Sequence, residues 1–179
     1  MEIEILYYAK DLSVRHITYP ITQFLSKVSN IEYKFRRLDA IPIDFYNKNR
    51  KQYRGDYVNI WLRNLSDSDL VSGILDVDGY VPSLNFIFGV ATPAINTFTV
   101  YLHRLKYDAN EDLFYLRVQK EFMHELGHVL GLEHCVIKKC VMSFSNTIYE
   151  VDYKEAKFCP LHFNKLLKLG FTLDLSLEL

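Results

Sequence analysis

The segment HELGHVLGLEH, from His124 to His134, is the most informative part of the sequence and indicates both the fold and the chemistry of the protein. On a helix, histidines at positions i and i+4 lie one turn apart, so both imidazoles can reach the same metal ion. Glu125 is rotated away from that line and can accept a proton from a water on the metal. Gly131 can adopt the left-handed conformation that ends a helix, so His134 can return as a third ligand. The segment predicts a catalytic zinc held by His124, His128 and His134, with Glu125 as general base.

The length of this pattern separates it from a chance match. A bare HExxH also occurs on ordinary solvent-facing helices. The longer pattern specifies three histidines, one glutamate and one glycine, and average residue usage puts its chance occurrence on the order of 10⁻⁷ per start position. We therefore favour a metal site over a solvated helix face.

The segment lies at the end of the clearest predicted helix, residues 110–130. Asn110 can cap its start, and the acidic residues that follow suit the positive end of the helix dipole. An apolar stripe has helical spacing, and both histidines lie away from it, which fits a cleft. The stripe consists of Tyr115, Val118, Phe122, Leu126 and Val129.

The rest of the chain alternates between short candidate strands and helices, which predicts an α/β domain. We expect strands at residues 2–8, 31–38, 57–62, 84–90 and 98–105. We expect further helices at residues 20–28, 43–53, 70–75 and 160–169.

Composition narrows the class of protein. The 179 residues are 49% apolar and 24% charged, which suits a single globular domain. A formal net charge of -1 gives no reason to expect a nucleic-acid or anionic-membrane partner. Residues 79–102 carry no charge, but prolines and asparagines interrupt them, so we expect strands and no transmembrane helix. His16 and His103 have no motif around them, and we expect ordinary roles for both.

The three cysteines, Cys135, Cys140 and Cys159, all lie in the C-terminal part. The start of the chain lacks a basic region followed by a long apolar run, so we expect no secretory signal. An odd number of cysteines without such a signal argues against a disulfide framework. We therefore expect metal or thiol chemistry in a reducing compartment, and a cytoplasmic location.

The extended zinc motif resembles the signature of the metzincins, in which a methionine lies in a tight turn beneath the zinc. Met142 is similar to that residue. Cys135 follows the motif directly, and Cys140 lies two residues before Met142. This continuation, with Cys159-Pro160-Leu161-His162 further on, resembles the archaemetzincins. Segments at residues 76–78, 84–91 and 104–105 also resemble that family.

The resemblance implies a metzincin-like zincin fold, with a twisted mixed β-sheet, an active-site helix and a small C-terminal lobe that carries a structural zinc. We expect one domain over residues 1–179, with an upper lobe of about 1–131 and a lower lobe of about 132–179. By resemblance, the ligands of the second zinc are Cys135, Cys140, Cys159 and His162. His162 departs from the family pattern, which has a cysteine there, but three cysteines and one histidine form an acceptable tetrahedral site.

The resulting hypothesis is a zinc-dependent peptidase with two zinc ions, one catalytic and one structural. By resemblance it has at most a modest aminopeptidase-type activity. We expect a monomer whose partner is a peptide or protein substrate, which could pair with a strand at residues 98–104. The first alternative is a catalytically weak or inactive zinc-binding protein that uses the cleft for peptide binding or regulation. The second is a zinc-stabilised interaction module, which would not need three further histidines and a glutamate.

Overall fold

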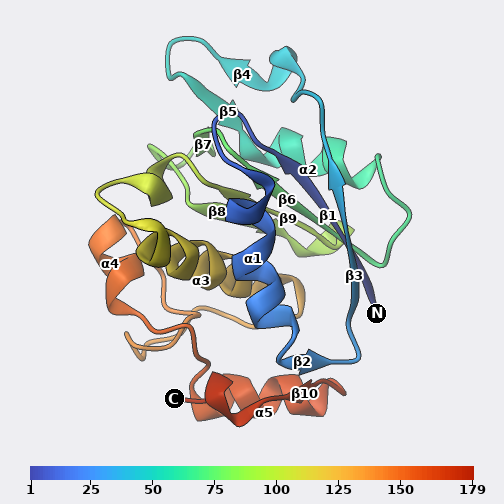
Figure 1. Cartoon of the computed structure of the whole chain (residues 1–179), viewed down its shortest axis with the longest axis vertical. Helices are drawn as coiled ribbons and strands as arrows, with labels where there is room; N and C mark the ends of the chain where they lie inside the picture. Colours follow the sequence, from blue (N-terminus) through green and yellow to red (C-terminus); the bar gives the residue numbers. More distant parts are fainter.

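A computed structural model describes residues 1–179 and contains a five-stranded sheet at its centre (Figure 1). The order of the strands is β3 (Glu32–Arg37), β1 (Glu2–Tyr8), β6 (Leu70–Leu75), β9 (Thr97–Tyr101) and β8 (Gly89–Thr92). The first four strands are parallel, and β8 runs antiparallel to β9 at one edge. The expected twisted, mixed sheet is therefore present.

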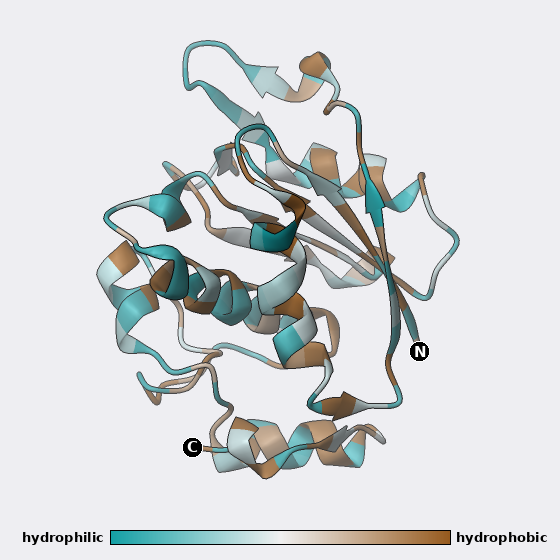
Figure 2. Cartoon of the chain, viewed as in Figure 1, coloured by the Kyte–Doolittle hydropathy of each residue, from teal (hydrophilic) through white to brown (hydrophobic).

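Helices cover both faces of this sheet because its central strands are apolar on both sides. In β1, Ile3 and Ile5 pack in the larger core with α1 (Val14–Leu25) and α3 (Glu111–Val129). Leu6, which follows Ile5 and therefore points to the other face of the sheet, packs in the smaller core with α2 (Gly55–Arg63). Figure 2 shows hydrophobic residues along the central strands and hydrophilic residues on the exposed β3 edge.

Smaller elements surround this frame. The C-terminal part contains α4 (Ile148–Tyr153), α5 (Pro160–Lys168) and β10 (Thr172–Leu173), and β10 pairs antiparallel with β2 (Val28–Ser29). A second small sheet joins β4 (Tyr46–Asn47), β5 (Gln52–Arg54) and β7 (Gly79–Tyr80). Short 3₁₀ turns lie at Ile43–Phe45, Pro93–Ile95, Arg104–Lys106 and Leu175–Leu177. No helix is both long and apolar enough to cross a membrane.

Two short apolar segments have the opposite structure from the one expected. Residues 57–62, expected as a strand, lie in α2, where Val58 and Leu62 are buried one turn apart and Ile60 is exposed. Residues 70–75, expected as a helix, form β6, in which every residue is buried. A central parallel strand is covered on both faces, so it shows no alternation, and periodicity alone cannot separate it from a buried helix.

Other boundaries also differ. Residues 43–53, expected as a helix, form a 3₁₀ turn and the β4–β5 hairpin. The helix expected at residues 20–28 starts earlier, at Val14, and contains Pro20. The strand expected at residues 84–90 is shorter and shifted, because only Gly89–Thr92 pairs with β9. The strand expected at 98–105 ends at Tyr101 and lies inside the sheet, so the prediction that it offers a free edge for substrate is wrong. That edge belongs to β8.

The end of β6 is fixed by a buried carboxylate. Asp76 is 4% exposed and accepts hydrogen bonds from the backbone N–H groups of Lys10 and Asp11, at 3.2 and 3.0 Å. It also pairs with Lys106, which follows β9. One side chain thus ties together the segments after three neighbouring strands.

We expect Asp76→Asn to lower the free energy of unfolding by about 1–3 kcal/mol, because the amide loses the charge and one acceptor for these buried donors. Urea denaturation measures the change. Asp67→Asn, at an exposed position, should stay close to wild type; an equal loss in both variants would contradict the role of Asp76.

Candidate metal centre

Two backbone carbonyls orient the first two histidines of the motif. The Nδ1–H group of His124 donates to the Val141 carbonyl at 2.8 Å, and that of His128 donates to the Leu132 carbonyl at 2.9 Å. The Nε2 atoms are therefore unprotonated, and they lie 3.1 Å apart. Two lone pairs that face each other at this distance need a cation between them, and a second hydrogen bond of this kind is the usual support of a metal-ligating histidine.

The third histidine arrives after the predicted turn. Gly131 has a φ of 86°, the left-handed conformation expected at the end of α3. His134 then stacks beside His124, and the ring of Phe144 packs against it with centroids 5.1 Å apart. One ligand atom from each of His124, His128 and His134 lies within 4.8 Å of the other two. The structure thus brings the three expected ligands together.

A methionine supports this cluster from below. Met142 is fully buried, and a Cβ atom added to Gly127 would lie 2.4 Å from its Sδ atom. Gly127 sits in α3 between His124 and His128, so the absence of a side chain lets the methionine approach the helix beneath the histidines. This is the packing role that the sequence predicts for Met142.

The electrostatics of the cluster keep the imidazoles neutral. Burial lowers the pKa of His124 well below its ordinary value, and the nearby Lys154 ammonium lowers it further. Burial also lowers the pKa values of His128 and His134. Metal ions bind the neutral form of imidazole, so the three rings are ready to act as ligands at neutral pH.

Glu125 lies inside the cleft and against the sheet edge. It is 5% exposed, and a Cβ atom added to Gly89 of β8 would lie 2.6 Å from its Oε1 atom. Burial raises the pKa of its carboxyl well above the ordinary value; the neighbouring Glu121 adds to the rise and Lys154 opposes it. Position and pKa both suit a group that gains and loses a proton.

The four residues expected at the second site also converge. The Sγ atoms of Cys135 and Cys159 are 3.7 Å apart, and His162 Nδ1 lies 3.4 Å from Cys159 Sγ and 3.6 Å from Cys140 Sγ. Zinc–sulfur bonds of about 2.3 Å at tetrahedral angles place ligand atoms ~3.5–3.8 Å apart. The donor set therefore fits a zinc ion, and all three cysteines are free thiols.

The thiols of Cys135 and Cys140 are protonated without a metal. Burial raises the pKa of Cys140 to about 12 and also raises the pKa of Cys135. Burial lowers the pKa of His162, so its ring is neutral. A metal ion would have to displace the thiol protons, which makes its binding depend on pH.

Three consecutive residues connect the two clusters. Cys140 faces the thiol cluster, the Val141 carbonyl accepts the hydrogen bond from His124, and Met142 packs under Gly127. The Met142 carbonyl also accepts a hydrogen bond from the N–H group of Cys135 at 3.0 Å. His16 and His103 stay outside both clusters, as expected for ordinary residues.

Comparison with known proteins agrees with this geometry. The sequence profile of Peptidase family M54 matches residues 14–168. Archaemetzincins of Aeropyrum pernix and Saccharolobus solfataricus are 42% and 40% identical to the chain, over 72% and 73% of its length and 73% and 74% of theirs. The chain belongs to the archaemetzincins. It is accordingly a zinc-dependent peptidase.

Solved archaemetzincin structures share the fold. That from Methanopyrus kandleri has a TM-score of 0.81 at 32% identity and covers 94% of both chains. That from Archaeoglobus fulgidus, complexed with malonate, has a TM-score of 0.80 at 33% identity and covers 92% of this chain and 99% of that one. The expected archaemetzincin fold is confirmed.

A buried ion pair beside the histidines was not expected from the sequence of this archaemetzincin. Glu121 Oε1 and Lys154 Nζ lie 2.9 Å apart, with side chains 4% and 1% exposed. The signal available in the sequence was the spacing of Glu121, three residues before His124 and four before Glu125, which places it on their side of the helix. Nothing local pointed to Lys154, which follows α4.

We expect Lys154→Met to lower the free energy of unfolding by about 3–5 kcal/mol, because it leaves the Glu121 carboxylate buried and unpaired. Chemical denaturation of the zinc-loaded protein tests this. The matched control is Lys139→Met, which breaks the exposed Lys139–Glu155 pair and should cost at most about 1 kcal/mol. If both variants lost a similar free energy of unfolding, the buried pair would contribute no more to stability than the exposed pair.

Proposed function

We propose that His124, His128 and His134 hold the catalytic zinc, the first two through their Nε2 atoms. The observation that carries this assignment is the pair of Nε2 lone pairs that face each other at 3.1 Å. When bound there, zinc supplies a Lewis acid that polarises a water molecule and the scissile carbonyl. The remaining steps fall to residues of the chain.

Glu125 is the proton carrier in this proposal. Its carboxylate accepts a proton from the attacking water, whose oxygen bonds to the carbonyl carbon of the substrate. The carboxyl then gives that proton to the leaving amine nitrogen as the carbon–nitrogen bond breaks. Contact with Gly89 keeps Glu125 beside the sheet edge, and its raised pKa favours delivery of the proton.

The substrate backbone binds along β8. The Tyr101 N–H group donates to the Phe88 carbonyl at 2.8 Å, and hydrogen-bonded pairs alternate along an antiparallel ladder. Gly89 and Ala91 therefore direct their N–H and C=O groups away from β9, towards the free edge. An extended peptide adds to such an edge through main-chain hydrogen bonds.

The second, structural zinc is proposed to bind Cys135, Cys140, Cys159 and His162, the last through Nδ1. Support comes from the spacing of the donor atoms and from the N–H group of Cys159, which donates to Cys140 Sγ at 3.2 Å. This ion would anchor the segment that carries Val141 and Met142. The proposed division into two lobes falls near Gly131, where α3 ends.

We further propose that the protein acts as a monomer on peptides or proteins in the cytoplasm, without nucleic-acid or membrane partners. Free thiols suit a reducing compartment. A formal net charge of -1 gives no electrostatic reason to expect polyanionic partners. Whether cleavage occurs within chains or at the amino terminus follows from the products of a peptide library.

We expect Glu125→Gln to lower kcat about 10²–10⁴-fold, because the amide cannot carry the proton. The zinc content, measured by mass spectrometry of the metal, should stay the same, since Glu125 is not a ligand. Glu32→Gln on the exposed β3 edge is the matched control and should retain activity. Equal turnover in Glu125→Gln and wild type, or no chelator-sensitive turnover of any library peptide, would reject the catalytic role and favour a peptide-binding protein.

We expect the metal-free protein to take up two zinc ions per chain, and Cys140→Ser to take up one. At pH 7 the second site should release protons on binding, because the raised pKa values keep Cys135 and Cys140 protonated, whereas the histidines are already neutral. Its affinity should therefore rise from pH 6.5 to 8, while that of the histidine site stays flat. Calorimetry in buffers of different ionisation enthalpy measures both; a single ion in wild type would eliminate the second site.

A further inference from the structure

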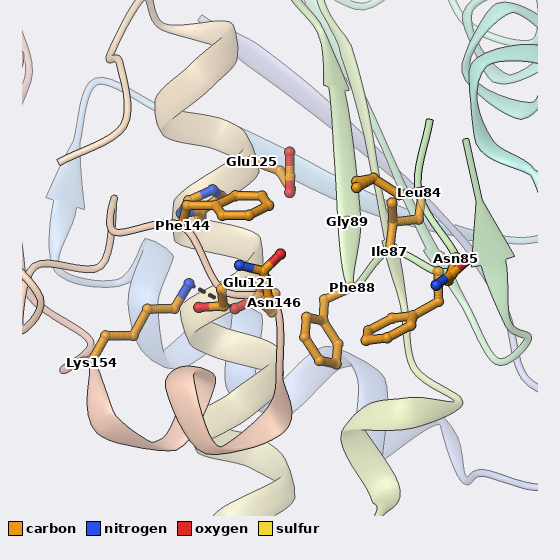
Figure 3. A pocket seen from close by; sticks show the side chains of 13 residues that line it. Leu84, Asn85, Ile87, Phe88, Gly89, Glu121, Glu125, Phe144, Asn146 and Lys154 are labelled. Carbon is orange, nitrogen blue, oxygen red and sulfur yellow. Dashed lines mark ion pairs between the residues drawn. The ribbon is translucent and has the colours of Figure 1, made fainter. Parts of the chain in front are cut away.

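A cavity of about 200 Å³ opens beside Glu125, between α3 and residues 84–89 (Figure 3). At one end it reaches His124 and Glu125, so a side chain inside it would belong to a residue next to the scissile bond. A separate hollow, lined by residues that include Ala91, His128 and His134, shares none of its lining residues with this cavity.

The Glu121–Lys154 pair lines the inner part of this cavity. Figure 3 shows Lys154 reaching Glu121 from the side away from Phe88, so that Glu121 lies between the ammonium and the cavity. Lys154 also lies 3.4 Å from the Ser143 carbonyl, to which it donates. Glu121 Oε1 is fully buried against this ammonium and has no hydrogen bond beyond the ion contact, and Oε2 has no hydrogen bond either, although a carboxylate offers about four acceptor positions. Oε2 is not buried, so it is the oxygen that a ligand in the cavity can reach. Of the two charged groups, the Glu121 carboxylate is therefore the one that can form a further hydrogen bond with a ligand.

The walls of the cavity suit a long side chain with an apolar stem. Phe86 and Phe88 form an edge-to-face pair with centroids 5.2 Å apart, and Phe144 lies across from them. Aromatic faces attract cations as well as methylene groups. The aromatic rings can pack on the apolar stem of a lysine or arginine side chain, and the Glu121 carboxylate can accept hydrogen bonds from its charged end.

The direction of β8 decides which substrate residue enters. From Gly89 to Thr92 the strand runs from the cavity towards the hollow at His134. A peptide that pairs antiparallel, the slightly more stable arrangement, runs the other way, from His134 towards Glu121. The residue that reaches the cavity then follows the scissile bond.

We propose that this cavity selects a lysine or arginine immediately after the scissile bond, through an ion pair with Glu121. The inference rests on the proposed catalytic site and adds the class of substrate. An acidic side chain is disfavoured, because Glu121 lies between it and Lys154 and because Glu125 is a second carboxylate in the same cavity. A purely apolar side chain would leave Glu121 without the missing donor.

The test uses peptides that differ only at the residue after the cleaved bond: lysine, arginine, norleucine or glutamate. Norleucine keeps the stem of lysine and lacks its ammonium. For the zinc-loaded enzyme, kcat/KM should be about tenfold or more higher for lysine and arginine than for norleucine, as expected for a buried charge-assisted hydrogen bond. Glutamate should be the poorest. Mass spectrometry of the products identifies the cleaved bond.

The lysine-to-norleucine ratio in variants assigns the preference to Glu121. In Glu121→Gln the ratio should fall to about one, whatever happens to the overall rate, and in Glu121→Asp a reduced preference should remain. The control Glu32→Gln should keep the wild-type ratio. A preference for acidic or apolar residues, a basic preference before the bond, or an unchanged ratio in Glu121→Gln would each overturn the proposal.

A binding measurement separates this inference from the proposed function. Short peptides that begin with lysine or norleucine, as the products would, are titrated into the zinc-loaded wild type and Glu121→Gln by calorimetry. Tighter binding of the lysine peptide that is lost in Glu121→Gln supports the cavity assignment even if no peptide is hydrolysed. Equal binding of both peptides to wild type, together with normal hydrolysis, rejects the cavity assignment alone.

Discussion

The geometry of the site depends on two hydrogen bonds from imidazole Nδ1–H groups to backbone carbonyls. They fix which nitrogen of His124 and His128 is unprotonated and where it points. One carbonyl follows the helix closely, at Leu132, but the other, at Val141, arrives from the C-terminal part of the chain. The helix therefore presents two histidines in register only when residues after the turn are packed against it, so that folding of the C-terminal part and formation of the site are one event.

The sheet positions the other half of the cleft. Gly89 brings the β8 edge directly against Glu125, so a substrate strand on that edge lies next to the carboxylate. The helix supplies His124, His128, Glu125 and Glu121 on one side. Burying this many polar groups requires charges of opposite sign nearby. Lys154 provides one positive charge within the protein. A metal ion bound between the facing Nε2 atoms of His124 and His128 would provide a second.

The sequence predicted the parts of this site that depend on local spacing. The turn at Gly131, the convergence of His124, His128 and His134, and the packing of Met142 all follow from positions close together on the chain. The secondary structure of short apolar segments was harder to predict from the sequence. Residues 57–62 and 70–75 exchanged their expected structures because pairing with distant strands, which no local pattern encodes, decides between a buried strand and a helix face. The Glu121–Lys154 pair could not be predicted for the same reason, because only the packing of α4 against α3 brings Lys154 next to Glu121.

The segment from Cys140 to Met142 leaves little room for evolutionary change in length. Each of its three residues contacts a different part of the protein: Cys140 lies in the cysteine cluster, the Val141 carbonyl binds the ring of His124, and Met142 packs against Gly127. Inserting or deleting one residue would shift every later side chain by one position and exchange these contacts. Changes in length should therefore accumulate on either side of this tripeptide, in the exposed stretch from Val136 to Lys139 or beyond Phe144, and not within it.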